Sequence, residues 1–115
     1  MLDLVQGATG EAALLRWPTL PPLLTYGRDR DGAKARRYQA LIMASVATDV
    51  AIRERGVIDG QGAWWWDRRD ELRAGRPHLI EWYNCSGVEV SGVTIRDSPF
   101  WTLHPVYSDS VWIHQ

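Results

Sequence analysis

The chain has 115 residues, of which 45% are hydrophobic and 23% are charged, and its formal net charge at pH 7 is −1. This composition is typical of one globular domain and excludes a disordered chain. A net charge this close to zero gives no general attraction to nucleic acid or to an anionic membrane surface, so we predict neither partner. No apolar run approaches the roughly 18 residues of a membrane-spanning helix.

The sequence carries no targeting or disulfide signal. The segment from Met1 to Val5 lacks the charged start and apolar core of a signal peptide, so localisation does not follow from the chain itself. A single cysteine, Cys85, precludes an internal disulfide. Because Cys85 aligns with Ala47 and Ser108 in the repeats described below, we interpret it as a small residue in a tight coil rather than as a reactive thiol.

Residues 1–40 are predicted to form an N-terminal segment with an extended, proline-rich connector. Glu11 to Arg16 is compatible with one helical turn. The connector is Trp17 to Leu23, whose three prolines remove backbone donors and favour extended geometry in the residues before them. The alternating charges from Arg28 to Arg37 favour a solvated loop over a phosphate-binding patch.

A short strand pattern recurs three times between residues 48 and 113. Alignment of the first copy with the second pairs Ile42 with Ile80, and alignment of the second with the third pairs Ile80 with Leu103. The copies are Thr48-Asp49-Val50-Ala51-Ile52, Ser86-Gly87-Val88-Glu89-Val90 and Asp109-Ser110-Val111-Trp112-Ile113. The recurrence predicts stacked coils of a solenoid over residues 41–115.

The spacing and residue types favour a parallel β-helix. A period in the low twenties fits strands whose side chains alternate between interior and solvent, with each coil burying its apolar face against its neighbours. A leucine-rich repeat has a similar period but requires Leu-x-x-Leu-x-Leu, whereas this chain uses Val and Ile. A Gly-containing corner, Ser91-Gly92, also joins two strands within one coil. We therefore predict an all-β solenoid of about three coils.

The first repeat is fifteen residues longer than the second, and we assign most of the difference to an inserted loop at residues 63–76. Asp67 to Arg73 is predicted to form one or two helical turns. Gly60 and Gly62 are expected to permit a sharp exit from the coil. For Trp64-Trp65-Trp66 we favour packing against the solenoid over stacking on a sugar ring.

Three segments carry a specific combination of motifs: Gly56-Val57-Ile58-Asp59-Gly60-Gln61-Gly62-Ala63-Trp64-Trp65-Trp66, Arg76-Pro77-His78-Leu79-Ile80 and Asp97-Ser98-Pro99-Phe100-Trp101-Thr102-Leu103-His104-Pro105. This combination resembles the polygalacturonase family of pectin-degrading enzymes, glycoside hydrolase family 28. Upstream, Trp17-Pro18, Leu20-Pro21-Pro22-Leu23 and Tyr26-Gly27-Arg28 look like the plant-type members. The resemblance covers residues 17–115.

The resemblance implies a right-handed parallel β-helix of the pectin lyase-like superfamily. Family members hydrolyse α-1,4 bonds between galacturonic acid residues by inversion, and they use no metal and no organic cofactor. The implied partner is therefore pectin or a related polyuronide, and the implied location is extracellular or in the cell wall.

The family's catalytic segments do not occur in this sequence. Glycoside hydrolysis generally needs one carboxylic acid and one carboxylate. In the family, three aspartates supply them, in an Asn-Thr-Asp-Gly segment and an Asp-Asp pair, followed by Gly-His-Gly and Arg-x-Lys segments. None of the four is present in the sequence. Because these segments follow the matched part in the family, we expect an N-terminal fragment that contains no catalytic residue and is inactive alone.

Three single residues are candidates for a role at a site. Asp59 is predicted to close a turn through nearby backbone N–H groups rather than to act in catalysis. Trp101 is expected to pack in the core or the coil, just before a strand. His104, after that strand, is the candidate substrate-binding residue, although a hydrogen-bonded structural histidine is the stronger alternative. His78 and His114 show no ligand spacing with His104 or Cys85, so we predict no metal site.

Two classes of function remain open. The first is a piece of a polygalacturonase-like pectin hydrolase, and the alternative is a non-catalytic solenoid that binds acidic polysaccharide or protein. Nucleic-acid binding would need a basic face that the net charge does not support. A last coil that ends at Gln115 would expose its strand edges, so we also expect the chain to associate with other chains.

Overall fold

The computed structural model describes residues 19–20, 36–72 and 74–114. The predicted helical turn at residues 11–16, most of the proline-rich connector and nearly all of the charged run lie outside these residues. The connector contains one described strand, β1 (Thr19–Leu20). It pairs antiparallel with β2 (Arg37–Tyr38), which lies just before the first coil. In the described residues, no helix is long and apolar enough to cross a membrane.

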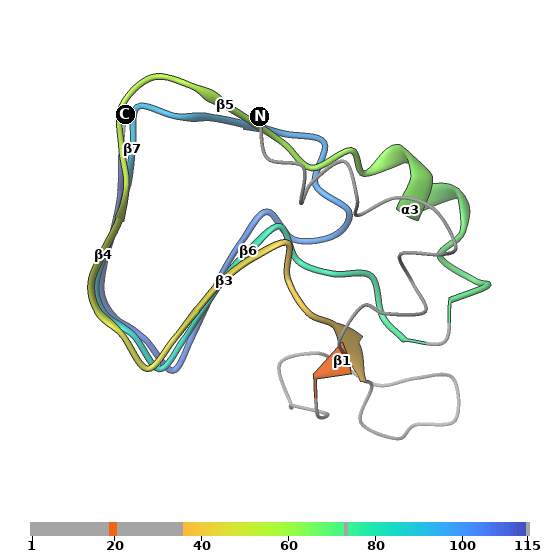
Figure 1. Cartoon of the computed structure of the whole chain (residues 1–115), viewed down its shortest axis with the longest axis horizontal. Coiled ribbons are helices and arrows are strands. Elements are labelled where there is room, and N and C mark those ends of the chain that lie inside the picture. The colour runs from red at the N-terminus through yellow and green to blue at the C-terminus, as the bar shows by residue number, and fades with distance from the viewer. Residues whose placement is uncertain (1–18, 21–35, 73, 115) are drawn as a thin grey trace.

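Three parallel ladders of strands make up the main body of the structure (Figure 1). The first ladder contains β3 (Ile42–Ser45), β6 (Ile80–Tyr83) and β9 (Leu103–Val106). The second contains β4 (Thr48–Ile52), β7 (Ser86–Ser91) and β10 (Asp109–His114). The third contains β5 (Val57–Asp59) and β8 (Thr94–Arg96). The chain visits the ladders in this order and then returns to the first, so the fold is the predicted partial parallel β-helix.

The register of the ladders confirms the repeat found in the sequence. Ile42 pairs with Ile80 and Ile80 with Leu103, as the alignment of the sequence copies predicts. The second ladder has the same two spacings between its strands. Figure 1 looks almost along the solenoid axis, so that β3 overlies β6 and β4 overlies β7. Equivalent positions of the sequence copies are thus direct neighbours in space.

The third ladder departs from this spacing by one residue. Val57 pairs with Thr94, whereas the alignment of the first two copies would pair it with Ile95. Two residues, Arg55 and Gly56, separate Glu54 from β5, whereas Val93 alone separates Gly92 from β8. Of the fifteen extra residues in the first repeat, one therefore lies at this corner and fourteen lie in the loop between β5 and β6.

The same backbone conformation forms this corner in both coils. Glu54 and Gly92 have positive φ, at 74° and 73°. Glycine adopts such a conformation at no steric cost, whereas a residue with a Cβ does so less readily. Both coils therefore bend in the same way at this corner, and the extra residue of the first coil lies after the bend.

The core lies between the ladders and follows the period-2 alternation of strand side chains. In β6, Ile80 and Trp82 point inward, and in β7 Val88 and Val90 do so. The buried core cluster consists of Leu41, Leu79, Ile80, Trp82, Cys85, Val88 and Val90. Cys85 is buried, as its alignment with small residues predicts, and its thiol lies 3.6 Å from the carbonyl oxygen of Ala44. Each coil thus buries its apolar face against its neighbours.

The first corner of every coil uses a residue in the left-handed region. Val46, Asn84 and Tyr107 occupy this corner, with φ of 51°, 52° and 49°. Asparagine tolerates this conformation because its short polar side chain bonds locally, whereas a β-branched residue is strained there. Val46 is 72% exposed, so it gains little from packing. The first coil therefore holds strain at a position where the second coil has none.

Replacing this valine with the residue that the next coil uses should stabilise the chain. Val46→Asn is expected to raise the free energy of unfolding by about 1 kcal/mol, because a left-handed L-residue costs about 1–2 kcal/mol. Urea unfolding followed by circular dichroism measures the change. The reciprocal variant Asn84→Val is the matched control and should lower stability by a similar amount. An unchanged midpoint for both variants would show that the corner conformation is not strained.

The loop between β5 and β6 contains one short helix, α3 (Ala63–Asp67). The expected helix over residues 67–73 is wrong, because residues 68–71 form turns and the helix lies one turn earlier. The physical reason is tertiary: Trp65 is fully buried and its ring packs against that of Tyr38, with centroids 5.7 Å apart. Burial of this indole fixes the helix around Trp65, whereas the charged residues that follow have no apolar face to bury.

The glycines before α3 serve close packing rather than backbone freedom. Gly62 has ordinary helical backbone, with φ −68°, and the left-handed residue of this segment is Gln61, with φ 48°. A Cβ on Gly62 would lie 2.5 Å from the carbonyl oxygen of Ser98 and 2.7 Å from that of Asp97. These glycines are therefore needed because the neighbouring coil leaves no room for a side chain, and not for a left-handed backbone.

Candidate functional site

The strand register brings two polar side chains together on the outer face of the first ladder. Glu81 in β6 pairs with His104 in β9, so their side chains emerge on the same face of neighbouring strands. This face is opposite to the one that carries Ile80 and Trp82. His78 lies two residues before β6, and its ring is next to that of His104, with centroids 4.0 Å apart. We call His78, Glu81 and His104 the histidine–glutamate cluster.

All three side chains of the histidine–glutamate cluster are buried. Their residues are 1%, 1% and 6% exposed, respectively. The Nδ1 atom of His104 lies 3.0 Å from Oε2 of Glu81, which is hydrogen-bonding distance. The Nε2 atom of His78 lies 3.9 Å from the same oxygen. One carboxylate oxygen therefore faces both imidazole rings.

The environment of His78 disfavours its protonated form. Burial, followed by the nearby charges of His104 and Arg37, lowers the pKa of His78 from 6.5 to about 3. A buried imidazolium would lose hydration and would face other positive groups. His78 is consequently a neutral imidazole at physiological pH.

Two arginines and two aromatic rings enclose the cluster. The guanidinium carbon of Arg37 lies 4.3 Å from the centroid of the Phe100 ring, and that of Arg76 lies 4.8 Å from it. Arg37 donates a hydrogen bond to the carbonyl oxygen of Arg76, at 2.7 Å. The Phe100 and Trp101 rings are stacked, 5.5 Å apart with an angle of 7° between their planes. These contacts fix the segment before β9 against the segment before β6.

Trp101 corrects one expectation from the sequence. It does not pack in the core, since it is 51% exposed and precedes β9 on the outer side of the ladder, where it packs against coil residues only in part. One part of its ring contacts His78 and His104, with centroids 5.4 Å and 5.1 Å away. The rest faces solvent. Trp101 is thus the member of this region that can present a flat apolar surface to a bound molecule.

His104 also differs from its expected position. It lies within β9 rather than after the strand, and it is buried and hydrogen-bonded. Its substrate-binding role stays a prediction. A buried His104 could reach a substrate less easily than its neighbour Trp101, which is exposed to solvent. The spacing of His78 and His104 along the sequence does not reflect their distance in the structure. Although far apart in the sequence, they lie in adjacent coils, and with Glu81 they offer ligand atoms within 4.8 Å of one another.

Asp59 has the structural role predicted for it. Its Oδ1 accepts a hydrogen bond from the backbone N–H of Gln61, at 2.9 Å, and closes the turn after β5. Its Oδ2 lies 3.3 Å from the guanidinium group of Arg96, which is its partner residue in β8. One oxygen therefore closes the turn within its own coil, and the other joins this coil to the next.

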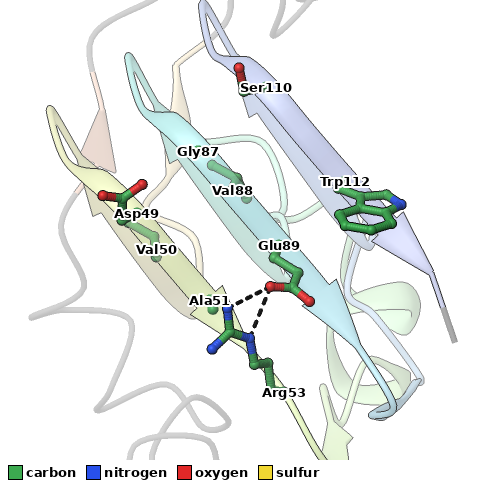
Figure 2. Close-up of a pocket in the computed structure, with 9 residues that line it drawn as sticks. All are labelled: Asp49, Val50, Ala51, Arg53, Gly87, Val88, Glu89, Ser110 and Trp112. Carbon is green, nitrogen blue, oxygen red and sulfur yellow. Dashed lines mark hydrogen bonds and ion pairs between the residues drawn. The ribbon is translucent and has the colours of Figure 1, made fainter.

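A second candidate surface is a shallow groove on the outer face of the second ladder (Figure 2). Gly87 and Ala51 have little or no side chain, and this leaves space between the larger residues that Figure 2 shows around them. Arg53 donates two hydrogen bonds to Oε2 of Glu89, at 2.9 and 2.7 Å. Bonding to Arg53 and then to His114 holds the pKa of Glu89 below its ordinary value. Arg53 and Glu89, two of the three charged residues that line this groove, neutralise each other.

Comparisons with known proteins place the chain in one family. The family model described as "Glycosyl hydrolases family 28" matches residues 25–115. A protein named "Probable polygalacturonase" from Vitis vinifera is 45% identical over 101 residues, which are 85% of this chain and 20% of that protein. A probable polygalacturonase from Arabidopsis thaliana is 34% identical over 55 residues, which are 48% of this chain and 11% of that protein. No solved structure matches the chain.

The chain spans about a fifth of the length of the first of these relatives and about a tenth of the second. The match of the family model includes all three ladders and the histidine–glutamate cluster. The parallel β-helix that the register demonstrates agrees with the fold that the resemblance implied. The chain belongs to glycosyl hydrolases family 28.

Proposed function

We propose that this chain forms part of the coil stack of a pectin-degrading hydrolase of the polygalacturonase type. The observation that carries the proposal is the family match over residues 25–115, together with a relative named as a probable polygalacturonase. The coil stack supports it, because stacked coils provide the long, rigid face along which a polymeric substrate can lie. The substrate class is then a polyuronide such as pectin.

We further propose that the chain alone does not hydrolyse this substrate. An inverting glycosidase needs an acid and a base about 6.5–9.5 Å apart, with room for water between them. The carboxylates described above have other tasks, since Asp59 closes a turn, Glu89 pairs with Arg53, and Glu81 bonds His104. The four catalytic segments of the family are absent from the sequence. The chain would therefore supply scaffold and substrate-facing surface, and further coils would supply the chemistry.

A reducing-sugar assay tests the second statement. The purified chain, incubated with polygalacturonate, is expected to release no reducing ends above a buffer blank, while an active polygalacturonase digests the same substrate in a parallel tube. Turnover that co-purifies with the chain through two different columns would overturn the statement.

The transcript tests the first statement. We expect the reading frame to continue past Gln115 and to encode the Asn-Thr-Asp-Gly, Asp-Asp, Gly-His-Gly and Arg-x-Lys segments within the next coils. A stop codon directly after Gln115 would contradict the hydrolase proposal. It would favour the alternative, a non-catalytic solenoid that binds acidic polysaccharide or protein.

A further inference from the structure

We propose that His78, Glu81 and His104 form a binding site for a divalent transition metal, with Zn²⁺ as the best-fitting ion. The three side chains come from two adjacent coils and offer ligand atoms within 4.8 Å of one another. The site's role would be to join two coils through a shared ion.

The donor set favours zinc over the hard cations. Two imidazoles and one carboxylate are a common three-ligand set for Zn²⁺, with water in the fourth position. Calcium and magnesium prefer oxygen ligands throughout, and this cluster offers only the carboxylate oxygens of Glu81. Imidazole suits Zn²⁺, Cu²⁺ and Ni²⁺, so these three ions would compete for the site.

The distances require only small side-chain movements. Ligand bonds of about 2.0–2.1 Å in a tetrahedron place neighbouring ligand atoms about 3.3 Å apart. The contact between Glu81 and His104 is 3.0 Å, and the contact between Glu81 and His78 is 3.9 Å. The first is slightly shorter than the ideal edge and the second slightly longer, and all three ligand atoms lie within 4.8 Å of one another. Rotation of the His78 ring toward both the carboxylate and His104 would bring the set toward tetrahedral geometry.

The backbone holds the ligands in place without a metal. Glu81 and His104 are register partners in a parallel ladder. The segment that carries His78 is fixed by two hydrogen bonds, from Leu41 N–H to the His78 carbonyl oxygen at 3.1 Å and from Leu79 N–H to the Trp101 carbonyl oxygen at 2.9 Å. A framework held this firmly reduces the ordering that metal binding would otherwise require.

The charged groups of the site have opposite effects on the binding of a dication. Arg37 lies close enough to His78 to affect its protonation, so its guanidinium group opposes a dication. The carboxylate of Glu81 contributes the compensating negative charge. Metal binding would use the Nδ1 lone pair of His104, so the ring must carry its proton on Nε2 in the bound form. The hydrogen bond between His104 and Glu81 would then be exchanged for two bonds to the same ion.

Calorimetric titration of the chain with Zn²⁺ tests the proposal. We expect one ion per chain, with binding at least about tenfold weaker in each of His78→Ala, His104→Ala and Glu81→Gln, because loss of even an outer-shell partner costs about 10–100-fold. The matched control is His114→Ala, because His114 pairs with Glu89 at 3.1 Å in a second, exposed His–Glu pair. This variant should bind Zn²⁺ like the parent chain.

A second readout needs no variant and so does not depend on whether a variant folds. Long-range proton–nitrogen spectra of the histidine rings in the parent chain, recorded with and without Zn²⁺, should show metal-induced shifts at Nε2 of His78 and Nδ1 of His104. The ring nitrogens of His114 should stay unchanged. Absence of binding, or shifts confined to His114, would overturn the proposal.

Discussion

Replacing Trp65 with alanine is expected to lower the free energy of unfolding by about 3–5 kcal/mol, the range for removing a large aromatic side chain from a core. Trp65 is fully buried, and its ring packs on Tyr38 and, edge to face, on Trp64. The indole joins α3 to the segment that begins the first coil. Its loss would leave a cavity that the rigid solenoid cannot collapse to fill. Urea unfolding followed by far-UV circular dichroism measures the effect.

The control for this variant is the same substitution at an exposed tryptophan. Trp112 is 65% exposed, and its ring stacks on His114, 4.4 Å away. Trp112→Ala should change stability by less than about 1 kcal/mol, since exposed sites contribute little. If Trp65→Ala and Trp112→Ala shift the midpoint equally, the inserted loop does not contribute to the core. If Trp65→Ala is already unfolded without urea, the lost free energy exceeds the total stability of the chain. That outcome also supports the prediction.

Gly62→Ala is expected to destabilise the chain by about 1–3 kcal/mol through overpacking. Gly62 is the N-cap residue of α3, a position where alanine is not favoured over glycine. The close contact adds to this cost. The added methyl group would meet the carbonyl oxygens of Asp97 and Ser98, and the Gly62 N–H donates to the first of these at 2.8 Å. Trp66 bonds the second through its indole N–H, also at 2.8 Å.

Gly56→Ala separates contact from conformation. Gly56 has no heavy atom within 4 Å of the position of an added Cβ, and its φ is not positive. Alanine there should be neutral, or stabilising by about 0.4–1 kcal/mol through the unfolded state. The measured quantity is the difference between the two urea midpoints. Equal midpoints for Gly56→Ala and Gly62→Ala would show that the coil yields at Gly62, and that the close approach of α3 contributes no stability.

The ladders of this fold could be predicted from the sequence because register partners in a parallel β-helix are also repeat partners. The alignment of the three copies, read from their apolar residues, gives the register of the first two ladders. The shift by one residue in the third ladder was not predictable. Glu54 adopts positive φ at its corner just as Gly92 does, so no residue type marked the extra position.

The short helix shows where local pattern loses to tertiary contact. Residues 67–73 have the charges of a helix and are followed by Gly75, yet α3 forms earlier, around the buried Trp65. A run of three tryptophans does not reveal which ring will be buried. That choice depends on Tyr38, which is distant in the sequence and contacts Trp65 only in the folded chain.

The histidine–glutamate cluster was within reach of the sequence but was missed. The alignment of the second and third copies already places Glu81 beside His104 and His78 beside Trp101. Ligand spacing is usually sought along one helix or one strand, and by that test residues 78 and 104 are unrelated. In a solenoid the relevant spacing is the coil length. Burial of Glu81 could not be predicted, because an isolated acidic residue on an outer strand face is normally solvated.

The corner between the second and third ladders has a consequence for how coils of unequal length stack. The first coil has one more residue there than the second, yet β5 and β8 still pair in parallel and the next strands return to their usual partners. The extra residue of the first coil is accommodated in the corner, outside the strands. It does not change the pairing of the following coil. Insertions and deletions at such corners change the cross-section locally, and mismatches in length do not accumulate along the solenoid axis.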